Sequence, residues 1–475
     1  MSRTELLPDR IIVVSDLHLG EGVAPVRGRI SGEHFFHDRA FATWLSRLTR
    51  RGSRRGQRLE LVVNGDAFDF LRVTRIPEGR RAVAAWRLLL RAARVQGRGV
   101  RDRLRQAAVG RFTFRERTFG FGSDEACSVW KLAVIAAAHW SVFQALAAWC
   151  RAGQALVIVR GNHDPEWAWP GVRRALMVLL ERAGEGKGEG TFAFRRIRFR
   201  SRVHRRANVH VEHGHDVQWL TRTEHDFSAG QPERLRLSFG SLISRYVLNV
   251  LERRVPPRPV PPPPSPALPP SGRLVQALHE DPWSLVPAIV SNALRAIPFI
   301  GLSGWRPWFG RLLQWWPARV SMTMSTALLV ALPLTPFIGD AGLGRSRGGV
   351  MLASLLGLCV PIAGFMSRQI AAEIDRDGLE AEVRRYARRV ATAWEGGELR
   401  PPPAARRYVV FGHTHRADAR EWSGAEGGIV YLNPGAWAPR PEERGAPASP
   451  RFIWLARRGG YYARHRLLSL DAVTH

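Results

Sequence analysis

Short apolar runs rich in valine and isoleucine recur along the chain, and each ends in a cluster of polar residues. Apolar runs bounded in this way are typical of buried strands. Three runs near the C-terminus are expected to close the sheet. The main strands are predicted at residues 11–15, 61–64, 155–160, 208–212 and 408–411, and the closing strands at residues 429–433, 451–455 and 461–468.

Stretches rich in alanine, leucine and arginine lie between these runs and carry apolar residues at helical spacing. Such spacing places the apolar side chains on one face of a helix. Strands that alternate with helices indicate an α/β core built in layers. Helices are predicted at residues 41–49, 82–93, 130–149 and 173–182.

The chain between Asp216 and Pro403 differs in composition from the rest, so we expect a long insertion at residues 216–405. A proline-rich run at residues 256–270 predicts an extended, semi-rigid linker. Residues 283–319 follow, where tryptophans alternate with arginines. Amphipathic aromatic residues beside cations are typical of a membrane-interface segment.

Residues 320–366 predict a transmembrane helical hairpin, because 320–338 and 349–366 contain no charged residue. Each run approaches the ~20 residues needed to cross a hydrocarbon layer of ~30 Å. Arg311, Arg319 and Arg368 flank the hairpin and favour cytoplasmic outer ends. Prolines interrupt both runs, so a buried helix pair in a soluble lid is the alternative.

The charge of the chain indicates a polyanionic partner, because the formal net charge is +30 for 475 residues. Nucleic acid and an anionic membrane surface both fit. Almost all of this charge is arginine, Lys131 and Lys187 being the only lysines, which also fits a GC-rich genome. Three cysteines without a CxxC spacing predict neither a disulfide framework nor a thiolate zinc site, and fit a reducing compartment. No cleavable signal is expected before the first strand.

Side chains that can bind metals follow each of the five main strands. Ligands in open α/β sheets gather beyond the carboxyl ends of the strands, so we expect these side chains to converge. Oxygen and imidazole donors without thiolates suit manganese, iron or zinc, and there are enough donors for two ions. The set is Asp16 and His18, then Asp66 and Asp69, then Asn162, His163 and Asp164, then His213 and His215, and finally His413 and His415.

The order Asp-x-His, Gly-Asp-x-x-Asp, Gly-Asn-His-Asp, His and Gly-His-x-His, followed by Asn433-Pro434-Gly435, resembles that of the calcineurin-like metallophosphoesterases. The resemblance covers residues 11–215 and the chain from residue 408. It implies a layered α/β/β/α sandwich whose catalytic domain spans residues 1–215 and 406–475. A helical cap is then expected at about residues 71–154, and the insertion would be membrane-associating.

The resemblance also implies a role for each side chain in the set. A hydroxide bridging two divalent ions would attack the phosphorus. His163 would stabilise charge or protonate the leaving oxygen, while Asp69 and Asp164 would orient imidazoles or turns. His215 receives no role, and the other histidines match no motif. Asp16, His18 and His415 would hold one ion, Asn162, His213 and His413 the other, and Asp66 would bridge both.

The predicted hairpin makes the chain similar to the UDP-2,3-diacylglucosamine pyrophosphatases, although His163 stands where those enzymes typically carry arginine. We therefore expect a phosphodiester or pyrophosphate on a membrane lipid as substrate, with Mn²⁺ as the first choice of metal and Fe or Zn as alternatives. The catalytic domain would lie on the cytoplasmic side of the membrane. A nuclease, a cyclic-nucleotide phosphodiesterase and a membrane-anchored scaffold with a vestigial site are the other functions considered.

Overall fold

A computed structural model describes residues 7–22, 33–185, 196–218, 220–222, 227–228, 231–249, 376–393, 406–423, 428–437 and 449–470. The chain divides into two units, residues 1–296 with 383–475, and residues 297–382. All of the described residues belong to the first unit except 376–382. The predicted linker at 256–270, the tryptophan-rich segment at 283–319 and the hairpin at 320–366 all lie outside the described residues.

A six-stranded mixed sheet carries the first three motifs. Its strand order is β13-β12-β1-β2-β3-β4, in which β1 to β4 are parallel and β12 and β13 close the sheet in antiparallel pairing. The bounds are β1 (Arg10–Val14), β2 (Leu59–Asn64), β3 (Ala155–Val159), β4 (Ile197–Arg200), β12 (Arg451–Arg458) and β13 (Tyr461–Ser469).

A second, five-stranded mixed sheet carries the last two motifs. Its order is β10-β11-β9-β6-β5, and β9 lies parallel to both β6 and β11. Val209 on β6 pairs with Tyr408 on β9, so segments almost 200 residues apart become neighbours. The bounds are β5 (Val203–Arg206), β6 (Val209–Glu212), β9 (Arg407–Val410), β10 (Ala417–Trp422) and β11 (Ile429–Pro434), and a small hairpin pairs β7 (Phe227–Ser228) with β8 (Gln231–Leu235).

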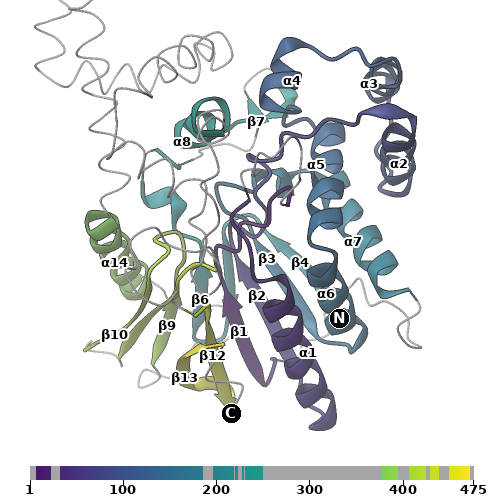
Figure 1. Ribbon diagram of the computed structural model, residues 1–475. Helices are drawn as coiled ribbons and strands as arrows, with labels where there is room; N and C mark the ends of the chain where they lie inside the picture. Colours follow the sequence, from purple (N-terminus) through teal and green to yellow (C-terminus); the bar gives the residue numbers. More distant parts are fainter. Residues whose placement is uncertain are drawn as a thin grey trace, which may run out of the picture. The chain divides into compact units, whose positions relative to one another are not determined.

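Both faces of β1 are buried, which explains its continuous apolar sequence. Ile12 and Val14 belong to a core cluster shared with the helices, whereas Ile11 and Val13 belong to a cluster shared with the second sheet. Figure 1 shows α1, α6 and α7 on one side of β1–β4, and β6 and β9 on the other. The described part of the chain is a mixed α/β structure with two mixed sheets and helices, which confirms the predicted α/β class.

The helices follow the predicted apolar spacing with one exception. Helix 130–149 is predicted as continuous, but this is wrong: α5 ends at Ala138, α6 begins at Trp140, and the two axes differ by 96°. The bounds are α1 (Asp38–Arg54), α2 (Gly79–Ala92), α3 (Arg98–Ala108), α4 (Phe114–Phe119), α5 (Glu125–Ala138), α6 (Trp140–Arg151), α7 (Pro170–Gly184), α8 (Phe239–Ile243) and α14 (Arg376–Ala393), with 3-10 turns at Pro165–Ala168 and His215–Val217 and a π turn at Ser244–Leu248.

The break at His139 has a local cause. His139 has φ −115° and ψ 38°, outside the helical region, and its Nδ1 and Nε2 atoms lie 2.8 Å from Asp38 Oδ1 and 3.1 Å from Glu33 Oε2. Across the described residues, no single helix has the length and apolar composition needed to cross a membrane, and only α5 and α6 taken together as a bent pair reach them.

Candidate metal centre

The predicted ligands lie at one edge of the two sheets. Asp16 and His18 follow β1, Asp66 follows β2, His213 follows β6 and His413 follows β9. Because β1 and β2 are parallel, and β6 and β9 are parallel, the carboxyl ends within each sheet share one edge. The two sheets thereby bring residues from the N-terminal and C-terminal parts of the chain to the same place.

Most of the ligands adopt a backbone conformation that is unfavourable for any residue other than glycine. Asp16, His18, Asp66, His413 and His415 have φ values of 54°, 52°, 49°, 66° and 60°. Within the described ranges only Arg94 and Ala207 share this left-handed conformation among non-glycine residues. Left-handed residues with a Cβ cost of order 1–3 kcal/mol each and concentrate at functional sites. The unfavourable backbone therefore coincides with the predicted site.

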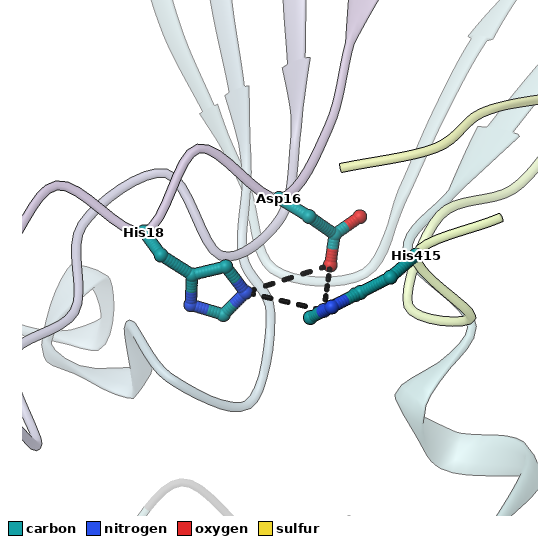
Figure 2. A group of neighbouring side chains, drawn as sticks. All are labelled: Asp16, His18 and His415. Carbon is teal, nitrogen blue, oxygen red and sulfur yellow. Dashed lines mark hydrogen bonds and ion pairs between the residues drawn. The ribbon is translucent and has the colours of Figure 1, made fainter. Parts of the chain in front are cut away.

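The first group of ligand atoms comes from Asp16, His18 and His415, which Figure 2 shows converging on one point. His415 Nε2 lies 3.2 Å from both Asp16 Oδ1 and His18 Nε2. His18 Nε2 lies 3.9 Å from Asp16 Oδ1. Two imidazole nitrogens and a carboxylate oxygen, all within 4.8 Å of one another, form a donor set suited to a divalent metal ion.

Two further groups meet the same distance criterion: His18, Asp69 and His163 form one, and Asp66, His213 and His413 form the other. Asp66 Oδ2 lies 3.2 Å from His213 Nε2 and 4.0 Å from His18 Nε2, so this carboxylate lies between the first group and the last. The carbonyl oxygen of Asn64 is 2.9 Å from His213 Nδ1, which leaves Nε2 to face the site. Burial and His213 lower the pKa of His413 to about 3, whereas Asp66 and Asp16 raise the pKa of His213 to about 10 although burial opposes this. Metal binding at His213 would therefore release a proton.

Unsatisfied polar atoms also fit a pair of metal ions. Asp16 Oδ1, Asn162 Oδ1 and His213 Nε2 are buried and have no hydrogen bond of good geometry to a described residue, the first and last having only the ion-pair contacts to His415 and Asp66. Buried polar atoms in native proteins are nearly always paired, and an ion is a common explanation for the exceptions. All three atoms belong to predicted ligands. The donor set therefore fits the divalent ions that the sequence implies.

Glycines in the motifs allow the loops to approach the ligands closely. A Cβ atom on Gly65 would overlap the ring of His213, and one on Gly161 would overlap Asp66 Oδ1. A Cβ on Gly412 would overlap Ser15 Oγ and approach Asp16 Oδ2 to 2.8 Å. No larger residue fits at these three positions without moving a ligand or its neighbour.

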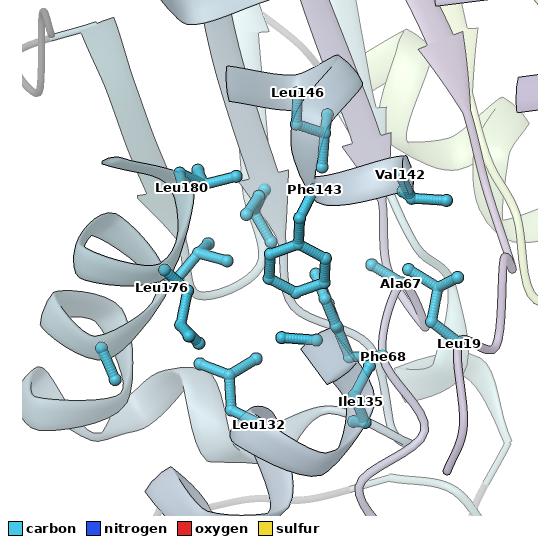
Figure 3. Packing of buried hydrophobic residues seen from close by; sticks show 14 of the residues in the cluster. Leu19, Ala67, Phe68, Leu132, Ile135, Val142, Phe143, Leu146, Leu176 and Leu180 are labelled. Carbon is cyan, nitrogen blue, oxygen red and sulfur yellow. The ribbon is translucent and has the colours of Figure 1, made fainter. Parts of the chain in front are cut away.

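The loop that carries Asp66 is anchored by its apolar residues. Figure 3 shows Ala67 and Phe68 of this loop packed with Leu19 and Phe143 in the core. His18 N donates to Asp66 O at 2.9 Å, and Leu19 N donates to Ala67 O at 3.1 Å, which joins the first two motif loops directly. The ligands are thus fixed by a packed, hydrogen-bonded support, as a precise site requires.

Asp69 connects His163 to the first ligand group. Its Oδ2 lies 3.0 Å from His163 Nδ1, 3.4 Å from His18 Nδ1 and 3.3 Å from Arg72 Nε. Burial lowers the pKa of His163, but the carboxylates of Asp69 and Asp66 outweigh this effect and raise the pKa to about 9. In the metal-free protein this favours the protonated imidazole at neutral pH, and 18 % of the side chain is exposed.

Asp164 joins two motif loops through their backbone. Its carboxylate accepts hydrogen bonds from Gly161 N at 2.6 Å and from Ala67 N at 2.9 Å. His163 N in turn donates to Asp66 Oδ1 at 2.8 Å. Burial and the nearby Asp66 raise the pKa of Asp164 to about 7. The loop after β3 is thus positioned by the loop after β2.

Comparison with known proteins gives no match to any family model, curated protein or solved structure. The functional interpretation of the centre consequently depends on its residues and their geometry.

Part of the segment predicted as the insertion reaches the site. Ser241 on α8 donates to the carbonyl oxygen of Asn162 at 3.1 Å. Thr221 Oγ1 donates to His215 O at 2.6 Å and lies 3.4 Å from His413 Nε2. His215 itself is buried, with its ring centroid 5.4 Å from that of His213, and belongs to neither ligand group.

Glu33, which is not among the predicted site residues, supports the first motif loop. Its carboxylate accepts from Gly20 N at 3.3 Å, Gly22 N at 2.6 Å and Phe35 N at 2.8 Å, and it also contacts His139. Glu33 follows no strand and matches no motif, so no sequence pattern indicates this role.

Arg72 and His34 were also missed, and both lie near His163. Arg72 contacts Asp69, as described above, and contributes to lowering the pKa of His34, which burial already places well below its usual value. The ring of His34 lies 6.5 Å from that of His18. The spacing of Arg72, three residues after Asp69, is the one signal that could have indicated it.

Proposed function

We propose that the protein is a phosphoesterase that works with two divalent metal ions. The observation that carries the proposal is the pair of adjoining Asp and His groups with Asp66 between them. Two ions a few ångströms apart supply an activated water nucleophile and stabilise both the attacking and the leaving oxygens of an in-line displacement. The donor set favours manganese first, with iron or zinc as alternatives.

The ligands divide between two positions. Asp16, His18 and His415 would hold one ion, and their convergence supports this division. The other ion would be held by His213 and His413 together with Asn162, whose buried amide oxygen has no partner among the described residues. Asp66 lies within reach of both groups and would be the shared ligand.

His163 would act on the leaving group of the phosphoester. It carries a proton at neutral pH because Asp69 and Asp66 raise its pKa to about 9 although burial opposes this. Part of its ring remains exposed, and Asp69 holds Nδ1, so Nε2 is the atom free to donate a proton to the leaving oxygen. Arg72 would add positive charge next to the phosphate.

The fold that this proposal requires is a layered α/β/β/α sandwich. Two observations support it: the six-stranded sheet shares one core cluster with helices and another with the five-stranded sheet. On the outer side of the second sheet, Arg384 of α14 donates to Asp418 at 2.8 Å, and the ring of Tyr386 packs against Phe411.

The substrate that we propose is a phosphodiester or pyrophosphate on a membrane lipid, cleaved at the cytoplasmic membrane surface. The support is the sequence of residues 283–366, with its tryptophans and charge-free runs. Nucleic acid is the alternative substrate because the formal net charge is +30.

The test combines metal analysis with hydrolysis. Purified protein with Mn²⁺ should bind two ions per chain and hydrolyse bis(p-nitrophenyl) phosphate, and a panel of lipid pyrophosphates, cyclic nucleotides and single-stranded DNA should identify the substrate class. Asp66→Asn should lose metal and at least about 100-fold in rate, because a shared ligand is removed. Asp418→Asn, outside the site, is the matched control.

His163→Ala separates proton transfer from metal binding. This variant should keep both ions and lose about 100-fold in kcat, the usual contribution of a general acid. Loss of metal from His163→Ala would overturn the role given to His163. Failure to hydrolyse any member of the panel, with unchanged metal content in Asp66→Asn, would instead support a scaffold with a vestigial site.

A further inference from the structure

The helices α2, α3 and α4 form a strongly basic group between the second and third motifs. Figure 1 shows these three helices lying together. Residues 79–119 contain twelve arginines, whereas Asp102 and Glu116 are the only acidic residues. Both acids are already paired, Asp102 with Arg105 at 3.4 Å and the buried Glu116 with Arg103. The surface of this group therefore carries unbalanced positive charge.

Apolar side chains are exposed where α3 meets α4. Val109 is 68 % exposed and Phe114 is 59 % exposed, and they begin and end a connection that we call the 109–114 loop. Exposed arginines surround them in the sequence: Arg105, with 77 % of its side chain exposed, Arg111 and Arg117. Exposed apolar side chains beside basic residues have the composition of a surface that binds an anionic membrane.

The 109–114 loop is held in one conformation by its own hydrogen bonds. Thr113 and Glu116 form a reciprocal cap, in which Thr113 N donates to Glu116 Oε2 at 2.9 Å and Glu116 N donates to Thr113 Oγ1 at 3.2 Å. Arg117 Nη2 donates to Gly110 O at 2.9 Å, and its guanidinium lies 5.7 Å from the ring of Phe112. The exposure of Val109 and Phe114 is therefore built into the loop.

Tyr246, close to the last described residue before the predicted membrane segment, lies against α4. Arg115, next to Phe114, donates to the hydroxyl of Tyr246, and the ring of Phe119 packs edge-on against Tyr246 at 5.0 Å. Asn249 donates to the carbonyl oxygen of Leu71 at 2.8 Å. The next 126 residues in the sequence, 250–375, include the tryptophan-rich segment and both charge-free runs.

We propose that the 109–114 loop and the arginines around it dock onto an anionic lipid surface, with Val109 and Phe114 entering the headgroup region. Arginines supply attraction to anionic headgroups, and the two apolar side chains supply insertion. Nucleic acid would use the arginines but would leave exposed Val109 without a partner. The proposal is independent of catalysis, because it concerns a surface and is tested by lipid contact.

The test places an environment-sensitive fluorophore on the loop of the full-length chain. Val109→Cys is labelled in a Cys359→Ser background, since Cys127 and Cys150 are buried and burial raises the pKa of both thiols, which suppresses their labelling. Vesicles containing phosphatidylglycerol should shift the emission to shorter wavelength, and vesicles of phosphatidylcholine alone should not. A label at Arg50→Cys, exposed on α1, is the control and should not respond.

A second variant tests the apolar contribution with the same readout. In the labelled chain, Phe114→Ser should raise the lipid concentration for half-maximal shift by roughly tenfold, the effect of losing one inserted apolar side chain. Trp140→Ser, which removes an exposed aromatic residue outside the loop, should leave it unchanged. No shift at position 109, an equal shift at position 50, or a shift produced by single-stranded DNA without vesicles would overturn the proposal.

Discussion

At the scale of single residues, the metal centre is built from backbone conformations that glycine would adopt more easily than its actual occupants. Asp16, His18, Asp66, His413 and His415 are all left-handed. Glycine has no side-chain donor atom. These positions therefore combine an unfavourable backbone conformation with a side-chain donor that faces the site. The site therefore reduces the stability of the metal-free protein, and binding of the proposed ions would offset that cost.

Replacing His415 distinguishes backbone strain from loss of the ligand. His415→Gly and His415→Ala both remove the imidazole, but only glycine relaxes the left-handed backbone at φ 60°. In the metal-free protein, His415→Gly should be more stable than His415→Ala by about 1 kcal/mol in the free energy of unfolding, measured by urea denaturation. Equal stability of the two variants would mean that the conformation carries no strain.

At the scale of elements, Glu33 and His139 join three segments that surround the first motif. Glu33 accepts hydrogen bonds from the loop after β1, and His139 links it to Asp38 in the first turn of α1. The break between α5 and α6 places His139 at this junction. The interrupted helix is therefore part of the support for the ligand loop.

This junction predicts a pH-dependent contribution to stability. Burial lowers the pKa of His139, but Asp38 and Glu33 outweigh this effect and raise the pKa from 6.5 to about 9. The stabilisation is fully present below pH 6.5, where the unfolded state also binds the proton, and it is lost as the pH rises through 9. Replacing His139 with glutamine should cost about 3 kcal/mol of unfolding free energy at pH 6.

Denaturation of wild-type and His139→Gln protein at pH 6 and pH 9.5 measures this difference. The difference in unfolding free energy between the two proteins should be smaller at the higher pH. His465→Gln, at a partly exposed histidine on β13, is the matched control and should show only a small gap at either pH. If the loss of unfolding free energy in His139→Gln were the same at both pH values, the variant would have lost packing contacts and not a charge interaction.

The same scale explains which strands the sequence predicts. Strands such as β1, β2 and β3 are buried on both faces, so their apolar runs stand out. The edge strands β4, β5 and β10 read IRFR, VHRR and ADAREW, and were missed because arginine and acidic residues interrupt the apolar pattern. Arginine stems can pack on a sheet while their charged ends reach water, which sequence hydropathy does not register.

At the scale of the whole molecule, a buried ionic cluster on Glu60 connects the two sheets. Glu60 on β2 lies 2.8 Å from His204 Nε2 on β5, and 3.0 Å from Arg198 Nη1 on β4. Arg206 on β5 lies 3.4 Å away. Glu60 and His204 are both almost fully buried, so each depends on its partners to compensate for lost hydration.

Glu60→Gln should therefore destabilise the protein by about 3 kcal/mol at neutral pH, since it removes the buried carboxylate that His204, Arg198 and Arg206 share. Burial raises the pKa of Glu60, but His204 and the two arginines outweigh this effect and hold the pKa below its usual value. This stabilisation is present above the unfolded pKa of about 4.5 and is lost as the pH falls through the folded value.

Unfolding by urea at pH 7 and pH 4 tests the Glu60 prediction. The difference in unfolding free energy between Glu60→Gln and wild type should be smaller at pH 4. Glu421→Gln removes an exposed pair with Arg406 and should change stability by less than about 1 kcal/mol. A larger effect at Glu421 than at Glu60 would contradict the assignment of Glu60 as the main ionic contact between the sheets.

The ligand set could be predicted from the sequence because each member directly follows a strand within a short motif. The structure brings six of the seven predicted ligands into two groups, with Asn162 following β3 nearby. Ser241 and Thr221 could not be predicted, because they contact Asn162 and His413, which are distant in sequence. Glu33 follows no strand and matches no motif, and only the spacing of Arg72 from Asp69 indicates that arginine. Local pattern thus indicates the candidate metal donors, whereas most of their supports depend on tertiary packing.

Because β6 pairs with β9, the candidate centre could report the association of two separate fragments of the chain. A fragment ending near residue 249 would carry Asp16, His18, Asp66 and His213, and a fragment beginning near residue 406 would carry His413 and His415. Neither fragment contains a complete donor set. Metal affinity would return only when the two fragments associate through adjacent strands, so ion binding would report complementation of a protein cut in two.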